Sequence, residues 1–400
     1  MLELSTNIYK NHKIPLDFRE IIYYNISVNN YRRCSPTGSE KTMKRFNTIG
    51  VLTSGGDAPG MNCAIRAITR RALANGLKVK GILGGYSGLI KNEMIDLDAR
   101  AVSNIENLGG TVLLTDRCDE FKTEEGMQAA IANCKKNNID AIVAIGGDGT
   151  FRGATDLSLR GIPTIGVTGS IDNDITATDY TVGFDTAMNT ALEAIDKLRD
   201  TCQSHARCNV VEVMGRDCGE IALKTGIASG AVAIAIPEVP FDEDAAIERI
   251  LKAKNAGKRS MLVVVSEGVF NAEGKPYGED LKKVIQDKTG IETKFARLAH
   301  IVRGGSPTLR DRLTATEMGS YAVDLLLDGK SDCIVAEVDG RIVSFDIKFA
   351  LTVDKMYKKK LKEGALEGFT PEQIGTMEEI CDFRASEIKR LYDIHLSLCE

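Results

Sequence analysis

Glycine and aspartate recur together in three short polar turns, each of which follows an apolar, β-rich stretch. SGGDAPG follows residues 49–53, GGDGT follows residues 141–145, and TGSIDND follows residues 163–167. Paired glycines let backbone N–H groups approach an anion without a Cβ in the way, and the N-terminus of a following helix is partially positive. The repetition predicts an enzyme that handles phosphate groups.

Two later stretches repeat the same design. Residues 209–213 lead into MGRDCG, and residues 261–265 lead into Ser266, Glu267 and Gly268. Ligands of open α/β sheets bind beyond the carboxyl ends of parallel strands, so we expect all five polar turns on the same side of a sheet. Ordinary turn chemistry explains any single one equally well, and the prediction therefore depends on the five together.

Helical patterns alternate with these strands. Apolar residues recur at helical spacing over residues 184–198, and residues 126–137 form a second amphipathic segment. Alternation of strand and helix is typical of βαβ units. With 400 residues, of which 43% are hydrophobic and 27% charged, the chain is long and apolar enough for two α/β lobes.

Composition argues against several classes of partner. The net charge is -5 and there is no block of Lys and Arg, which argues against a nucleic-acid surface. No apolar run is long enough to span a membrane, and no signal-peptide pattern opens the chain. The ten cysteines are scattered without a CxxC pair, as in proteins of a reducing compartment, so we expect a cytoplasmic location.

The two ends of the chain differ from the rest. The first 43 residues are rich in Asn and Tyr and lack helical or strand periodicity, which predicts a loosely ordered, solvated tail. Residues 363–400 carry apolar residues near helical spacing among charges, which predicts a helix that packs on the body or on another subunit.

Five motifs together identify a family resemblance. In this order and at these separations, TIGVLTSGGDAPGMN, IGGDGT, SIDND, VVEVMGR and HIVRGGSP resemble the motifs of the bacterial ATP-dependent 6-phosphofructokinases, and the resemblance covers about residues 48–362. The resemblance implies two similar three-layer α/β lobes with mostly parallel sheets, an active site in the cleft, and usually a homotetramer. It also implies transfer of a phosphoryl group from MgATP to the 1-hydroxyl of D-fructose 6-phosphate, the committed step of glycolysis.

The same resemblance divides the chain into parts. We expect a poorly ordered extension at 1–47, an ATP-binding lobe formed by 48–183 and 302–352, a fructose 6-phosphate and effector lobe at 184–301, and a C-terminal helical extension at 353–400.

Phosphoryl transfer to a hydroxyl needs a base, a metal on the phosphates, and positive charge against the transition state. Asp172 resembles the family's base, with Asp174 in support and Arg216 as a catalytic cation. Asp148 resembles the carboxylate associated with Mg²⁺, an ion that prefers oxygen ligands.

Further site residues follow from the matched motifs. The resemblance places these residues at the ATP site: Gly56, Arg117, Cys118, Gly147, Asp148, Gly149 and Thr150. It places these residues at the phosphosugar site: Ser170, Ile171, Asp172, Arg207, Met214, Gly215, Arg216, Glu267, Lys294, His300 and Arg303. Arg207 is expected to reach the 6-phosphate from a neighbouring subunit. An isolated histidine such as His300 is more often structural, but Arg303 and the glycine pair beside it favour binding.

The phosphoryl donor depends on two glycines. Pyrophosphate-dependent relatives carry an Asp at the position of Gly149 and a Lys at the position of Gly169, so both glycines favour ATP. One departure concerns Lys294, where the family usually has an arginine against the 6-phosphate. Lysine cannot make a bidentate contact, and Arg297 would compensate if this stretch were helical.

An effector site is only half present. Arg66, Arg70, Arg199 and Lys258 match residues that bind ADP or phosphoenolpyruvate in regulated relatives, and solvated helix charges explain Arg66 and Arg70 equally well. Two other classes of function stay open, a pyrophosphate-dependent phosphofructokinase and a non-catalytic regulatory paralogue. Loss of the base or the metal carboxylate would mark the paralogue.

Overall fold

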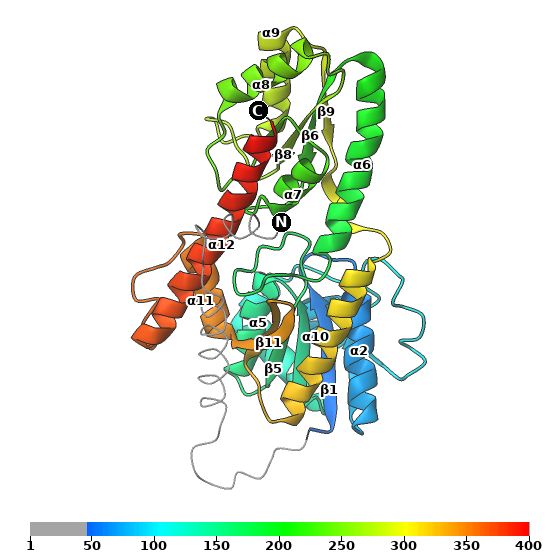
Figure 1. The fold of residues 1–400 in the computed structure, drawn as a ribbon. Coiled ribbons are helices and arrows are strands. Elements are labelled where there is room, and N and C mark those ends of the chain that lie inside the picture. Colours follow the sequence, from blue (N-terminus) through cyan, green and yellow to red (C-terminus); the bar gives the residue numbers. More distant parts are fainter. Residues whose placement is uncertain (1–45, 400) are drawn as a thin grey trace, which may run out of the picture.

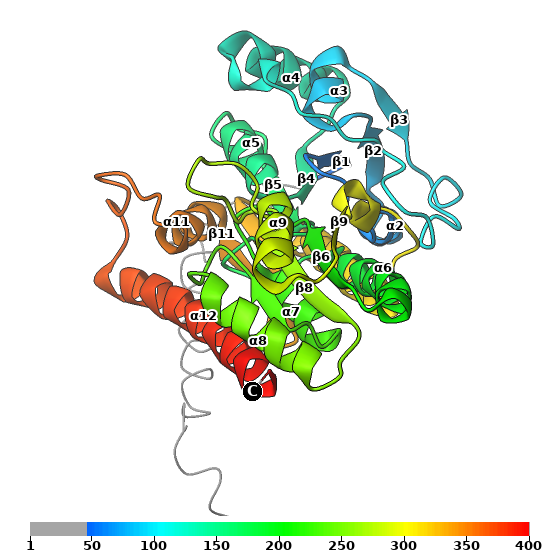
Figure 2. The same ribbon diagram turned by 90° about the horizontal axis from the view of Figure 1, so that it is seen from above.

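A computed structural model of the chain describes residues 46–399 and contains two α/β lobes, one above the other in Figure 1. The extension predicted at residues 1–47 lies outside the described residues except for its last two. Each lobe is built around its own sheet, and helices cover the sheets (Figures 1 and 2). The predicted α/β fold with mostly parallel sheets is confirmed.

The larger sheet has seven strands in the order β11-β10-β5-β4-β1-β2-β3. Its strands are β1 (Thr48–Ser54), β2 (Lys78–Ile82), β3 (Met94–Asp96), β4 (Ala141–Gly146), β5 (Thr164–Thr168), β10 (Cys333–Val338) and β11 (Arg341–Asp346). All neighbours pair in parallel except the edge strands β3 and β11. The central strands β1, β4 and β5 are buried along their whole length, as expected of continuous apolar runs covered on both faces.

The smaller sheet has four parallel strands in the order β7-β8-β6-β9. Its strands are β6 (Cys208–Val213), β7 (Ala233–Ala235), β8 (Met261–Ser266) and β9 (Thr293–Arg297). All five predicted strands exist, but the expectation that their turns share one sheet is wrong. Three strands belong to the larger sheet and two to the smaller one, so the polar turns meet across the junction of the lobes.

Helices fill the connections between strands. Their bounds are α2 (Met61–Ala74), α3 (Gly85–Lys91), η1 (Glu120–Lys122), α4 (Glu124–Lys136), α5 (Asp148–Ser158), α6 (Phe184–His205), α7 (Glu220–Ala228), α8 (Glu243–Asn255), α9 (Gly278–Thr289), η2 (Ala299–Arg303), α10 (Leu309–Leu327), α11 (Ile347–Tyr357) and α12 (Pro371–Leu398). The predicted apolar stripe of α6 is buried at Phe184, Ala187, Ala191 and Ile195. No helix within residues 46–399 is long and apolar enough to cross a membrane.

Helix α12 spans both lobes (Figure 1). Thr370 and Gln373 form a capping box at its start, and Pro371 occupies the first turn, where its missing N–H is not needed. Met377 packs in the core of the larger lobe, whereas the hydroxyl of Tyr392 donates to Ile234 O in the smaller lobe. The predicted C-terminal helix is therefore confirmed, and it packs on the body of its own chain.

Candidate functional site

Three glycine-rich turns begin at the same level of the larger sheet. Ser54 of β1 pairs with Gly146 of β4, and Gly146 pairs with Thr168 of β5. The hydroxyl of Thr150 donates to Ser54 O at 2.9 Å, which ties the first two turns together. Gly55 takes a φ of 86°, which favours glycine. The backbone of these turns thus forms one edge beyond the carboxyl ends of the strands.

Asp148 is the first residue of α5, directly after the cap residue Gly147. A Cβ at Gly147 or Gly149 would face open space, with no atom of residues 46–399, apart from the adjoining residues, within 4 Å of it. Burial raises the pKa of Asp148 and nearby Asp354 and Asp174 raise it further, while paired Arg152 lowers it. The N-terminus of a helix with open space before it is suited to an anion.

The turn TGSIDND continues into a loop at residues 170–180, called the catalytic loop below. The hydroxyl of Ser170 accepts from Asp172 N and donates to Asp174 Oδ1, both at 3.2 Å. Asp172 is only 2% exposed, and its Oδ1 atom has no hydrogen-bond partner among the described residues. These contacts fix a buried carboxylate with one unused oxygen.

Two arginines from other elements face Asp172. Its Oδ2 atom lies 3.7 Å from Arg216 Nε and 4.0 Å from Arg303 Nη2. Burial and the neighbouring Asp174 raise the pKa of Asp172 to about 6, although Arg303 and Arg216 lower it in part. A carboxylate with a pKa close to neutral pH is suited to proton transfer.

The smaller lobe presents the turn after β6 beside the turn after β8. Val213 pairs with Ser266, so the two strands end at the same level. Glu267 Oε1 accepts from Gly215 N at 3.3 Å and from Arg216 N at 3.1 Å. Arg216 takes a φ of 52°, an uncommon conformation for a residue with a side chain, and the contact with Glu267 holds it.

Arg303 joins the two lobes from η2. Its Nη1 atom donates to Asp57 O at 3.2 Å in the first glycine-rich turn. A Cβ at Gly56 would lie 2.6 Å from that same Nη1 atom, so a side chain there would displace the guanidinium. The larger and smaller lobes therefore meet around Asp172, as the sequence predicts.

The other residues predicted for the site differ in exposure. Thr150 and Met214 are buried, and Ile171 is a fully buried core residue. Arg117 and His300 are exposed, and Cys118 packs partly against the core of the larger lobe. The side chain of Ile171 therefore faces the core, which leaves its backbone as the part available to a ligand.

Arg207 and Lys294 do not join the centre within one chain. Arg207 precedes β6, and Lys294 pairs with Asn209 near the amino end of that strand. Both cations contact Glu292, with Arg207 Nε at 2.6 Å and Lys294 Nζ at 2.9 Å, and they hold the pKa of its carboxyl down at about 2. A six-residue strand is roughly 20 Å long, so this cation pair lies far from Arg216.

The assumption that Arg297 follows Lys294 by one helical turn is wrong. Both residues lie in strand β9, and residues three apart in a strand point to opposite faces. Arg297 contacts Glu212 on β6, with Nε 2.5 Å from Oε1. The strand therefore directs Arg297 away from the partners of Lys294.

The proposed effector residues are divided between the lobes. Arg66 and Arg70 on α2 contact Glu106 and Ser103 in the larger lobe. Arg199 near the end of α6 donates to Ser229 O, and Lys258 lines a small cavity beside α8. Within one chain the four cations do not form a single pocket.

Four residues that the sequence did not single out hold the catalytic loop. Lys358 Nζ donates to Asp174 O at 2.9 Å, and Asp354, also on the α11 side, accepts from Thr176 Oγ1 at 2.9 Å. Arg384 on α12 and Glu220 on α7 also contact the loop, both at Asn173. In the sequence these four charged residues look like the many solvated charges of helical segments, so no sequence signal distinguishes them from those charges.

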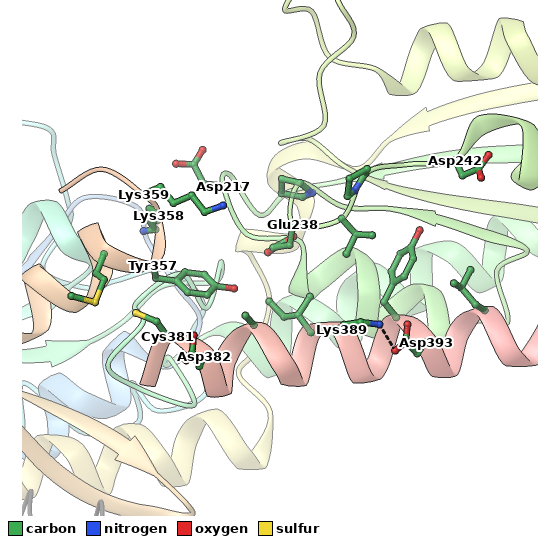
Figure 3. A pocket seen from close by; sticks show the side chains of 18 of the residues that line it. Asp217, Glu238, Asp242, Tyr357, Lys358, Lys359, Cys381, Asp382, Lys389 and Asp393 are labelled. Carbon is green, nitrogen blue, oxygen red and sulfur yellow. Dashed lines mark hydrogen bonds and ion pairs between the residues drawn. The ribbon is translucent and has the colours of Figure 1, made fainter. Parts of the chain in front are cut away.

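A cavity of about 1070 Å³ lies between the lobes along α12 (Figure 3). Lys358, Asp217, Glu238 and Lys389 are among its lining residues, whereas the glycine-rich turns and Asp172 are not. Several of its charges are already paired, as Lys389 is with Asp393 in Figure 3 and Lys360 is with Asp217. The cavity is therefore separate from the centre around Asp172.

Comparison with known proteins agrees with this architecture. Residues 48–326 match the family described as phosphofructokinase. The chain is 51% identical over 318 residues to an ATP-dependent 6-phosphofructokinase of Alkaliphilus metalliredigens, which covers 80% of this chain and 98% of that protein. It is 52% identical over 316 residues to one of Clostridium botulinum strain Hall, which covers 79% of this chain and 97% of that protein.

Two solved structures share the fold. The phosphofructokinase of Saccharomyces cerevisiae has a TM-score of 0.77 at 30% identity over 88% of this chain, which spans half the length of the yeast chain. A pyrophosphate-dependent phosphofructokinase of Marinobacter aquaeolei has a TM-score of 0.68 at 22% identity, over 84% of this chain and 91% of that one, and shows the fold alone. On its sequence and its fold, the chain belongs to the phosphofructokinase family.

Proposed function

We propose that the protein transfers the γ-phosphoryl group of MgATP to the 1-hydroxyl of D-fructose 6-phosphate, giving fructose 1,6-bisphosphate and ADP. The observation that carries this proposal is the placement of Asp172 between Arg216 and Arg303, where the two lobes meet beyond their strand ends. The relatives named as ATP-dependent 6-phosphofructokinases support the choice of substrates.

Asp172 acts as the general base. Its unpartnered Oδ1 atom accepts the proton of the 1-hydroxyl while the sugar oxygen bonds to the γ-phosphorus. The bond from that phosphorus to the β–γ bridging oxygen breaks at the same time, and its electron pair leaves with ADP. Because its pKa is about 6, the carboxyl is ionised at neutral pH and still basic enough to take a proton.

The arginines supply positive charge where the transition state is negative. Arg216 and Arg303 both lie close to Asp172. A phosphoryl group that is being transferred next to the base is therefore within reach of their guanidinium groups. Glu267 fixes the backbone of Arg216 and presents its other oxygen to the sugar hydroxyls. Met214, Gly215, Ser170, Ile171 and His300 border the sugar in this assignment.

The ATP site lies over the glycine-rich turns. Gly56, Gly147 and Gly149 bring backbone N–H groups to the phosphates, and Arg117 and Cys118 border the nucleotide. Thr150 supports this site by holding the first two turns together, since its own N–H is bonded to Gly147 O. Asp148 and Asp174 fit a Mg²⁺ ion, since they are neighbouring carboxylates whose mutual repulsion a cation would relieve. When bound, the ion neutralises charge on the phosphates. No group of three metal-ligating side chains occurs within residues 46–399, consistent with an ion held largely by ATP and water.

The active site is completed by a neighbouring subunit in this proposal. Arg207 and Lys294 would bind the 6-phosphate of another chain's substrate, because they lie at the opposite end of β6 from Arg216. We infer a homotetramer on this basis, located in the cytoplasm, with an effector site for ADP or phosphoenolpyruvate that Arg66 and Arg199 would form only between subunits.

The test is formation of fructose 1,6-bisphosphate from fructose 6-phosphate and Mg²⁺, with ATP or pyrophosphate as donor. We expect turnover with ATP that collapses in Asp172→Ser. Turnover with pyrophosphate alone would contradict the choice of donor made from Gly149 and Gly169. No turnover with either donor would instead support a non-catalytic regulatory paralogue.

A further inference from the structure

Arg384 is a buried cation in the middle of α12, directly against the catalytic loop. Its side chain is 11% exposed, and its partner Glu220 on α7 is 9% exposed. Burial of an arginine is costly unless hydrogen bonds and an opposite charge compensate for it. The contacts of Arg384 therefore indicate what the residue does.

The guanidinium of Arg384 donates to three backbone carbonyls of the catalytic loop. Nη2 donates to Asn173 O, and Nη1 donates to Thr178 O at 3.1 Å and to Ile175 O at 3.5 Å. The loop has no regular secondary structure, and of these carbonyls Ile175 O also accepts from Thr178 N within the loop at 3.2 Å. The donors of Arg384 therefore supplement the few hydrogen bonds that the loop makes with itself. Only arginine carries several N–H donors in a planar fork that can reach such a set at once.

A countercharge completes the arrangement. Glu220 Oε1 lies 2.8 Å from Arg384 Nη2, and its Oε2 atom accepts from Asn173 Nδ2 at 3.2 Å and from Lys224 Nζ at 2.6 Å. Burial tends to raise the pKa of Glu220, but Arg384 and Lys224 lower it more, so the carboxyl is ionised. Asn173 is therefore held through its backbone oxygen by Arg384 and through its side-chain amide by Glu220.

Asn173 follows Asp172 in the chain and takes a φ of 51°. Asparagine adopts this left-handed conformation more readily than most residues, and the side chain of Asn173 supports it by accepting from Thr181 N at 3.0 Å. The backbone oxygen of Asn173 is held by Arg384. If the contact with Arg384 were lost, the peptide after Asp172 would relax and the carboxylate would move relative to Arg216 and Arg303. A displacement of about 1 Å at a reacting group costs roughly 100-fold in rate.

We propose that Arg384 is a positioning residue, through which the C-terminal helix holds the catalytic loop with Asp172 in place for proton transfer. This inference rests on the proposed function. Since α12 packs on both lobes, the loop is fixed relative to the smaller lobe as well. Arg384 contacts none of the residues assigned to ATP or sugar, so its loss should affect turnover more than binding.

The experiment compares four full-length variants with the wild type. Arg384→Gln removes the fork and leaves Glu220 with less compensation. Arg384→Gln combined with Glu220→Gln removes both charges, and Arg384→Lys keeps the charge but not the fork. Arg390→Gln is the matched control, because Arg390 lies on the same helix in an exposed pair with Glu387.

We expect kcat to fall roughly 10- to 100-fold in all three Arg384 variants, with the KM for both substrates changed less than about 2-fold. The double variant and Arg384→Lys should lose less stability in denaturant than Arg384→Gln, since neither leaves a buried charge unpaired and only the hydrogen bonds to the loop carbonyls are lost. Hydrogen exchange of amides in residues 173–180 should be faster in the Arg384 variants and unchanged in Arg390→Gln.

A wild-type kcat in Arg384→Lys or in the double variant would overturn the proposal. Charge balance with Glu220 would then be enough to explain the role of Arg384. Unchanged amide exchange in Arg384→Gln would overturn it as well. The exchange measurement needs no turnover. Wild-type protein without ATP-dependent activity would therefore contradict the proposed function, while faster exchange in Arg384→Gln would still support the contact with the loop.

Discussion

Asp172→Asn is expected to stabilise the protein while it abolishes most of the activity. A rise of the pKa from 3.8 to about 6 means that folding disfavours the ionised carboxyl by about 3 kcal/mol. The folded chain binds this proton more tightly than the unfolded chain, so the free energy of unfolding falls as pH rises from about 4 to about 6. The side chain of asparagine has nearly the same shape and carries no charge at any of these pH values. Asp172→Asn therefore avoids this loss of free energy of unfolding.

The variant should therefore be more stable than the wild type by up to about 3 kcal/mol at pH 8 and by about half of that at pH 5. Urea unfolding followed by circular dichroism at the two pH values measures the difference. Asp200→Asn, an exposed substitution near the end of α6, is the control and should show no such gain. The kcat should fall roughly 10²- to 10⁴-fold. Equal stability of Asp172→Asn and wild type at pH 8 would refute the reasoning.

Three further perturbations test other parts of the account. Gly149→Asp should raise the KM for ATP without lowering the unfolding midpoint, because a side chain there meets open space in the protein and fills only the nucleotide's region; an unchanged KM would contradict this. Asp311→Ala should lower the free energy of unfolding, measured in urea, by roughly 3 kcal/mol, because it leaves the buried donors of Gly183, Thr186 and the Tyr180 hydroxyl without an acceptor. A loss below about 1 kcal/mol would contradict this. Mixing inactive Arg207→Ala and Asp172→Asn proteins under conditions of subunit exchange should restore activity, and no recovery would argue against sites shared between subunits.

The sequence predicts the parts of the fold that follow from local patterns. Strands β1, β4 and β5 and their turns are recognisable because apolar runs end in polar turns that contain glycine and aspartate. The pairing of Ser54 with Gly146 and of Gly146 with Thr168 then brings the turns together. The grouping of Asp172 with Arg216 follows from matched motifs and agrees with the geometry.

Other features depend on contacts between distant segments. β9 is a strand because it pairs with β6, and local propensity does not reveal that pairing for Lys294 and Arg297. Arg384 is one charge among many on α12, and only the packing of that helix on the catalytic loop distinguishes it. The distribution of strands between two sheets is likewise a long-range property.

The most direct test of the central claim is a phosphorus NMR measurement of one reaction mixture containing enzyme, Mg²⁺, ATP and fructose 6-phosphate labelled with ¹³C at carbon 1. The account predicts that ADP appears together with a phosphorus signal coupled to the labelled carbon. Absence of that coupling, with ATP unchanged or its phosphoryl group released to water, would contradict the assignment of Asp172 as the base for the 1-hydroxyl.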